Sequence, residues 1–247
     1  GIIRDIFTMG ARPVALLNSL RFGELSDKRV RYLFGGVVAG IAGYGNCMGI
    51  PTVAGEVYFS DSYADNPLVN AMCVGLLRHD QIVRGKAAGV GNSVMVVGAP
   101  TGRDGIHGAT FSSEALDPAS PVTAVQIGDP ITQKKFSDVI VKEARNLCLY
   151  HSITDNGAGG LSCSVAEMAK ECNGCHVLLE KVPLKYHGMA PWEILISESQ
   201  ERMTLAVPKE NLDEFMALML SREIEATVIG TFTGTGRCIV EFDGEVV

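Results

Sequence analysis

The chain has 247 residues, of which 47% are apolar, so it can build one large domain or two smaller ones with a substantial core. Its formal net charge of −7 argues against a general nucleic-acid-binding surface. The longest apolar candidate, residues 34–48, is interrupted by glycines and Asn46 and falls short of the roughly 20 residues that span a bilayer, so we expect no membrane segment.

The first 92 residues alternate apolar runs with segments rich in small residues. We expect a helix over residues 2–9 and a long helix over 28–46, whose glycines and alanines allow close packing on a sheet. The strands expected in this part cover residues 12–22, 52–59 and 68–77. A loop rich in Gly, Lys and Arg follows over residues 78–92.

The pattern restarts at Ser93 with an almost wholly apolar strand. The later strands are expected at residues 93–98, 152–154, 175–179, 202–207, 226–233 and 237–242, and the helices at 132–150, 160–171 and 209–221, with a short buried helix or strand at 192–196. We therefore predict an α/β (α+β) protein of two parts: a partial α/β unit over residues 1–92, and an α+β domain over 93–247 with a mixed sheet and helices on one side.

Two glycine-rich segments, residues 102–109 and 154–161, place acidic residues among glycines. Glycine lets backbone N–H groups approach a ligand closely, and strings of such groups form concave anion sites. A carboxylate in the same loop suggests that the anion arrives with a divalent metal ion. The helix expected from Gly160 would point its first N–H groups at that ligand. Ordinary tight turns are the alternative for either segment.

The segment Cys172–His176 matches the C-x-x-C-H pattern of c-type haem attachment. No secretory signal accompanies it, so we interpret it as a glycine turn between buried thiols. A zinc site would need two more ligands, and the spacing of Cys163 and His151 does not support one. The seven cysteines, an odd number without regular spacing, predict reduced thiols and a cytoplasmic location.

Two polar clusters are candidates for ligand contacts. Arg4 and Asp5 lie at the start of the first helix, where they suit a phosphate and its metal ion, although Asp5 could simply complement the helix dipole. Residues 198–202 precede an apolar strand, a position that often faces a ligand but is as often a solvated turn. His107 is the one histidine among glycines. We find no P-loop and no nucleophile elbow, and we assign no catalytic residue.

Taken together, these segments resemble the synthetase subunit of phosphoribosylformylglycinamidine synthase, in the family of ATP-using enzymes that includes aminoimidazole ribonucleotide synthetase. The segments that carry the resemblance are residues 1–6, 9–13, 18–23, 102–109, 126–130, 155–161 and 191–202. The resemblance runs along the whole chain. It implies a partial first subdomain of the aminoimidazole ribonucleotide synthetase-like fold over residues 1–92, followed by the C-terminal-type domain over 93–247.

The resemblance also implies an activity, in which ATP phosphorylates the amide oxygen of formylglycinamide ribonucleotide and ammonia displaces the phosphate. Magnesium would neutralise the phosphate oxygens during the transfer. Matched position by position, the implied substrate contacts are Arg4, Gln126, Glu198, Ser199 and Gln200, the magnesium ligands are Asp5 and Asp155, and Asp104 and His107 line the site.

Several features of the resembling family have no counterpart here, including its His-rich segment and its second half. The chain also begins at Gly1 without an initiator Met, so we expect a piece of a longer protein that is inactive alone. Its implied partners are a glutaminase subunit and a small accessory subunit. Because the first subdomains of the family pair into a barrel, we also expect a homodimer through the strands at residues 52–59 and 68–77.

Two alternatives stay open. One is another enzyme of the same fold, of the aminoimidazole ribonucleotide synthetase or thiamine-phosphate kinase type, although residues 198–200 together with Arg4 and Asp5 favour the formylglycinamidine branch. The other is a non-catalytic interaction module. The presence of Asp5, Asp155 and Gln126 together argues against such a loss of chemistry.

Overall fold

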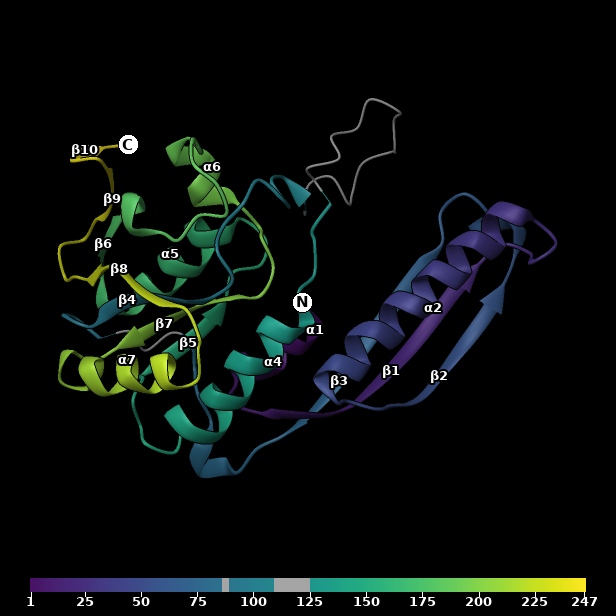
Figure 1. The fold of residues 1–247 in the computed structure, drawn as a ribbon, viewed down its shortest axis with the longest axis horizontal. Helices are drawn as coiled ribbons and strands as arrows, with labels where there is room; N and C mark the ends of the chain where they lie inside the picture. The colour runs from purple at the N-terminus through teal and green to yellow at the C-terminus, as the bar shows by residue number, and fades with distance from the viewer. Residues whose placement is uncertain (86–88, 109–124) are drawn as a thin grey trace.

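The computed structural model of the protein describes residues 1–85, 89–108 and 125–247. These residues form two β-sheets (Figure 1). A three-stranded sheet with one long helix projects from a larger body that is built on a seven-stranded sheet. The mixture of strands and helices is the α/β class that the sequence predicts.

The small sheet has the order β2-β1-β3. Its central strand β1 (Arg12–Phe22) pairs in parallel with β2 (Thr52–Phe59) and antiparallel with β3 (Leu68–Leu76). The parallel pairing requires a crossover connection, and α2 (Lys28–Met48) provides it. These four elements lie where the sequence predicts them, with the helix two residues longer at its end.

Helix α2 covers one face of the small sheet and leaves the other exposed. Phe34 makes edge-on ring contacts with Phe22 and Phe59, with centroid separations of 5.1 and 6.0 Å. The opposite face carries the exposed apolar side chains of Tyr58 on β2 and of Leu68 and Met72 on β3, whose register partners on β1 point away from the helix. The small sheet therefore has a side buried under the helix and an open side on which exposed apolar residues lie beside Arg21 and Glu56.

The large sheet has the strand order β10-β9-β6-β8-β4-β7-β5. Its strands are β4 (Ser93–Gly98), β5 (Ser152–Asp155), β6 (Cys175–Leu178), β7 (Arg202–Val207), β8 (Ala226–Phe232), β9 (Cys238–Phe242) and β10 (Glu245–Val246). The pair β6–β9 is parallel, and the other neighbouring pairs are antiparallel. The sheet is therefore mixed, as the sequence predicts.

Helices cover both faces of the large sheet, so the prediction of helices on one side is wrong. One face carries α4 (Pro130–Val139), the π-helical turn η4 (Ile140–Ala144) and α7 (Leu212–Ser221), and the other carries α5 (Gly160–Cys172) and α6 (Pro191–Ile196). In β4, Met95 and Val97 pack in the first core while Val94 and Val96 pack in the second. Double burial explains why β4 is apolar at nearly every position.

The single helix predicted over residues 132–150 is also wrong. Regular α-helix ends at Val139, the wider π-helical turn carries the chain to Ala144, and Cys148 then adopts a positive φ of 55°. Helical spacing alone could not reveal this change, because Val139, Ile140, Val141 and Ala144 are all buried. The remaining short elements are 3-10 turns: η1 (Asp61–Tyr63), η2 (His79–Gln81), η5 (Leu179–Lys181) and η6 (Lys209–Asn211).

The first helix, α1 (Ile2–Thr8), lies between the two sheets and contacts β3 and β5. Its Ile3 and Phe7 are buried in the core that lies beneath α4 and α7. Met48, Ile50 and Cys73 of the smaller unit join the same core. Because this core crosses residue 92, the division into parts at 1–92 and 93–247 stays a prediction.

Candidate functional site

A cleft of about 530 Å³ opens where α1 meets the ends of the large sheet. Its lining comes from five separate stretches of sequence: Gly1, Arg4, Asp5, Gly108, Gln126, Asp155, Gly157, Ala158, Glu198 and Gln200. Both glycine-rich segments reach it, one through Gly108 and the other through Gly157 and Ala158. Ala109, the last residue of the first segment, lies outside the described residues. The fold thus brings together six of the side chains that the sequence singled out.

Arg4 is the buried cation of the cleft. It is 1% exposed, and its Nε and Nη1 atoms have no hydrogen-bond partner among the residues that the structure describes. Its nearest anion is Asp155, whose Oδ2 lies 3.7 Å from Nε, too far for a hydrogen bond. A buried charge with unpaired donors is costly, so this guanidinium has donors ready for an anionic ligand.

Asp5 and Asp155 supply the two carboxylates of the cleft. Burial raises the pKa of Asp155, and the charge of Asp5 raises it further, while Arg4 opposes both effects. A divalent cation would relieve this unfavourable pairing of carboxylates. Among residues 1–85, 89–108 and 125–247, no group of three His, Cys, Asp or Glu side chains could hold a metal by itself. Two carboxylates completed by phosphate oxygens and water suit magnesium, so the donor set fits that ion.

Glu198 connects the second glycine segment to the rest of the cleft. Its Oε1 accepts a hydrogen bond from the Gly159 backbone N–H at 3.2 Å, and its Oε2 accepts one from Gln126 Nε2 at 3.2 Å. Gly159 is the N-cap of α5, so a carboxylate already occupies the helix N-terminus at which we expected a ligand. The N-terminus of the helix therefore helps to orient Glu198.

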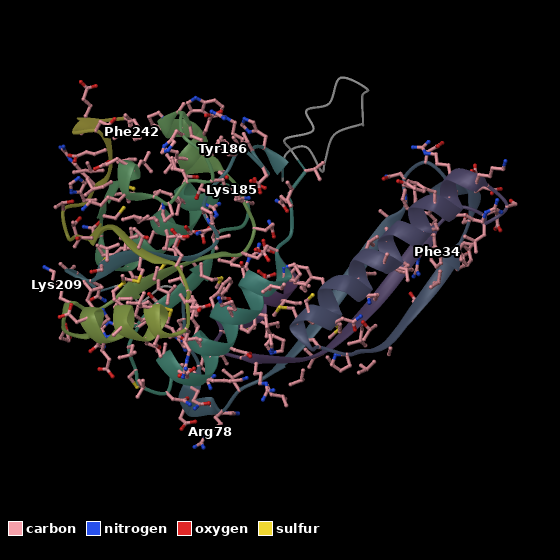
Figure 2. The ribbon with its side chains drawn as sticks, viewed as in Figure 1. Phe34, Arg78, Lys185, Tyr186, Lys209 and Phe242 are labelled. Atoms are coloured by element: carbon pink, nitrogen blue, oxygen red, sulfur yellow. The ribbon has the colours of Figure 1, made fainter. Side chains whose placement is uncertain are left out.

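Ser199, Asp104 and His107 lie outside the lining of the cleft. The Ser199 hydroxyl accepts from the Gly102 backbone N–H at 2.9 Å and donates to Asp104 Oδ1 at 2.7 Å. Asp104 also pairs with Lys185 at 2.9 Å, near the top of the larger body in Figure 2. Burial alone would raise the pKa of Asp104, but the hydrogen bonds from Lys185 and Ser199 outweigh it, and the pKa is lowered. His107 is exposed, and a site-lining role for it and Asp104 stays a prediction.

Arg202 is a residue whose role sequence reasoning missed. It is fully buried, and it donates to the backbone oxygens of Ser199 (2.8 Å) and Ser197 (2.5 Å) and to Thr101 Oγ1 (2.8 Å). Burial lowers its pKa to about 10, which leaves the guanidinium charged at neutral pH. Arg202 therefore fixes the turn that carries Glu198. The signal was available, since an arginine that begins an apolar strand must find buried partners.

Tyr44, Gln133 and Glu201 form a second polar cluster that the sequence did not reveal. The Tyr44 hydroxyl lies 2.6 Å from Gln133 Oε1 and 2.9 Å from Glu201 Oε1. Burial, and then the adjacent charge of Glu201, raise the pKa of Tyr44, which keeps its proton available for a hydrogen bond. The cluster ties α2 and α4 to the same turn that Arg202 holds. Side chains from three distant segments meet here, and no local pattern marks them.

The C-x-x-C-H segment adopts the turn that we predicted. Asn173 and Gly174 have positive φ angles of 65° and 150°, and Cys172 and Cys175 are buried on either side of them. Cys163 is exposed and contributes to no metal-binding group within the described part of the chain. The same part of the chain holds no helix with the length and hydropathy needed to cross a bilayer.

Comparison with protein families shows to which family the chain belongs. Residues 1–77 match the model described as AIR synthase related protein, N-terminal domain, and residues 89–243 match the corresponding C-terminal domain. The chain belongs to the AIR synthase related family. This membership confirms the fold class that we inferred from the resemblance.

The relatives to which the chain is similar include several PurL subunits. The phosphoribosylformylglycinamidine synthase subunit PurL of Carboxydothermus hydrogenoformans is 54% identical over 250 residues, which cover all of this chain and 34% of that protein. The structure of T. maritima PurL complexed with FGAR superposes with a TM-score of 0.91 at 37% identity and covers 100% of this chain and 40% of that one. T. maritima PurL complexed with ATP gives a TM-score of 0.85 at 35% identity, covering 100% of this chain and 38% of that one. The chain thus spans about a third of the curated relatives it matches.

Proposed function

We propose that this chain forms the substrate-binding part of a PurL-type synthetase, which converts formylglycinamide ribonucleotide (FGAR) to the amidine with ATP and ammonia. The observation that carries the proposal is the buried Arg4, which lies in a cleft beside two carboxylates and has two donors unpaired within the described part of the chain. The PurL structure in complex with FGAR, at a TM-score of 0.91, supports it. FGAR carries the phosphate that such a cation would bind.

The residues of the cleft have distinct tasks in this proposal. Arg4 donates from Nε and Nη1 to an anionic group of the substrate, a charge-assisted contact that both binds and orients it. Gln126 and Gln200 supply amide donors and acceptors at the cleft wall, and Glu198 is held in place by Gln126 and Gly159. Ser199 has internal partners, so we assign its side chain to positioning the turn, and its contact with substrate stays a prediction.

The two carboxylates of the cleft are the proposed binding groups for magnesium, which would accompany ATP. Asp5 and Asp155 would hold Mg²⁺, which when bound neutralises phosphoryl oxygens and positions the transferred group. An amide is a poor electrophile, and phosphorylation of its oxygen creates a leaving group that ammonia can displace. In this chain, the residues of the cleft would bind the amide substrate and orient it beside the two carboxylates that face the metal ion.

The proposed synthetase would act together with other subunits. Ammonia would come from a glutaminase subunit, with a small accessory subunit in the same complex. A second chain would cover the open side of the small sheet, where Tyr58, Leu68 and Met72 are exposed. Light scattering over a wide concentration range tests this second point. We expect the dimer to be weakened by Met72→Lys but not by Val246→Lys, because Val246 is also exposed but lies on β10. A monomer at every concentration would contradict the dimer.

Steady-state kinetics of the complete synthetase, with ammonia as the nitrogen donor, test the function. We expect Arg4→Ala to raise the KM for FGAR by at least about tenfold, because a charge-assisted contact contributes roughly 1.5–3 kcal/mol. Asp155→Asn should instead raise the magnesium concentration that half-maximal activity requires. Lys209→Ala is the matched control, since Lys209 is an exposed cation on η6 far from the cleft (Figure 2). An unchanged KM in the Arg4 variant would contradict the proposal.

A further inference from the structure

The C-x-x-C-H segment is left without a role by the proposed function, and its second cysteine has a partner that the spacing does not reveal. Cys175 Sγ lies 3.0 Å from Cys238 Sγ, although the two residues are 63 positions apart in sequence. They face each other in the parallel register of β6 and β9. These strands are near the edge of the sheet opposite β5, the strand that ends in Asp155 (Figure 1).

The backbone geometry suits a disulfide bond. Neighbouring strands lie about 4.7–4.9 Å apart, within the Cα separations of about 4.4–6.8 Å that disulfides span. The two sulfurs need to approach by only about 1 Å to reach the bonded distance of roughly 2.05 Å. The nearer cysteine in sequence, Cys172, is directed elsewhere, since its thiol lies 3.5 Å from the Ala169 carbonyl oxygen and 3.3 Å from that of Gly174.

We propose that Cys175 and Cys238 form an oxidisable dithiol that hydrogen peroxide converts to a disulfide joining β6 to β9. Cys238 is exposed and Cys175 is buried, so the oxidant reaches Cys238 first. The Cys238 thiol and one peroxide give a sulfenic acid and one water. The sulfur of Cys175 then attacks the sulfenic sulfur, the S–O bond breaks, and the second water leaves with the proton of Cys175. Two thiols are thus oxidised by one peroxide, which is reduced to two waters.

The two cysteines have different parts in this reaction. Burial, and then the hydrogen bond with Cys238, raise the pKa of Cys175, so this thiol does not react alone with a solvent-borne oxidant. Its proximity to Cys238 gives it a high effective concentration once the sulfenic acid has formed. Cysteine pairs of this kind in reducing compartments are usually transient and redox-responsive. The pair is therefore a modification site that is separate from the cleft.

Peptide mapping after peroxide treatment of the native, intact protein tests the proposal. A small molar excess of hydrogen peroxide, followed by alkylation, should yield one peptide that links Cys175 with Cys238, with two of the seven thiols of the chain lost. Dithiothreitol should restore both. We expect Cys238→Ser to abolish the link and Cys163→Ser, a change at another exposed cysteine, to leave it intact.

A second variant keeps the proposal open to contradiction if a single change affects folding. In Cys175→Ser, oxidation should stop at a sulfenic acid on Cys238 that a dimedone probe can trap, whereas the native chain should give at least about tenfold less trapped product. A Cys172–Cys175 link, a disulfide between chains, or oxidation of Cys238 without a link in the native chain would each overturn the proposal.

Discussion

Two buried arginine–aspartate regions lie close to each other in this molecule, and only one of them is complete. Arg202 makes three hydrogen bonds and lies in the field of Asp104, which is itself bonded to Lys185 and Ser199. Arg4 lies 3.7 Å from Asp155, and two of its donors are unpaired within residues 1–85, 89–108 and 125–247. The comparison teaches that burial of a charge is not by itself a mark of function. Unmet hydrogen-bonding capacity is the better sign of a ligand site.

The largest effect on stability should come from Arg202→Met. The change leaves buried acceptors on Ser197, Ser199 and Thr101 without their donor, and loss of such a charged partner costs about 3–5 kcal/mol. Urea unfolding would measure the free energy of unfolding. A loss below about 1 kcal/mol would show that water replaces the guanidinium, and it would contradict a structural role for Arg202.

Arg4→Met should behave in the opposite way. Because the unpaired donors of Arg4 contribute little to folding, we expect the free energy of unfolding to change by less than about 1 kcal/mol, or to rise. The affinity for FGAR should fall at least about tenfold in the same variant. If Arg4→Met instead destabilised the protein as strongly as Arg202→Met, the distinction between the two regions would fail.

The two aspartates should respond to amide substitution with opposite signs. The pKa of Asp104 is lowered, so its ionised form adds stability above the pKa of the unfolded chain, and this stability is lost as the pH falls through the folded value. The pKa of Asp155 is raised, so its ionised form opposes folding at neutral pH, and the penalty disappears as the pH falls through that raised value.

Thermal unfolding at neutral and at acid pH measures this difference. Asp104→Asn should lower the melting temperature at neutral pH and Asp155→Asn should raise it, and both differences should shrink in acid. Melting temperatures that shift in the same direction for the two variants would contradict the assignment of one region to structure and the other to ligand binding.

Gln200→Ala should have the smallest effect. Gln200 lines the cleft, and among the described residues its side chain donates only to the Glu198 backbone oxygen, at 3.2 Å, so folding should hardly depend on it. Loss of one neutral hydrogen bond to the substrate, about 1 kcal/mol, corresponds to roughly fivefold weaker FGAR binding. Calorimetric titration of this variant and the Lys209→Ala control resolves a change of that size. Equal affinities in the two would remove Gln200 from the site.

The sequence predicted the strands well where burial is continuous, as in β4 and β7, because an apolar run between turn residues has few other structures available. It did not predict the π-helical turn at Ile140–Ala144, since the same buried residues fit an α-helix. It also placed the helices on one face, because local periodicity does not say to which side of a sheet a helix returns.

Some residues of the candidate site could also be predicted from the sequence, and others could not. Arg4, Asp5 and Asp155 could be selected from the sequence because unusual charge and glycine context, together with the family resemblance, mark them. The internal role of Ser199 and the three bonds of Arg202 could not, because they depend on residues about 100 positions away, such as Gly102 and Thr101. Which polar side chains are already paired is a property of the tertiary structure alone.

The most direct test is a calorimetric titration of FGAR, in the presence of Mg-ADP, into the complete synthetase carrying either the native Arg4 or Arg4→Met. The account predicts saturable binding to the native protein and at least about tenfold weaker binding to the variant, with unfolding free energies that agree within about 1 kcal/mol. Equal affinities would contradict it, because the unpaired donors of Arg4 would then have no part in holding the substrate.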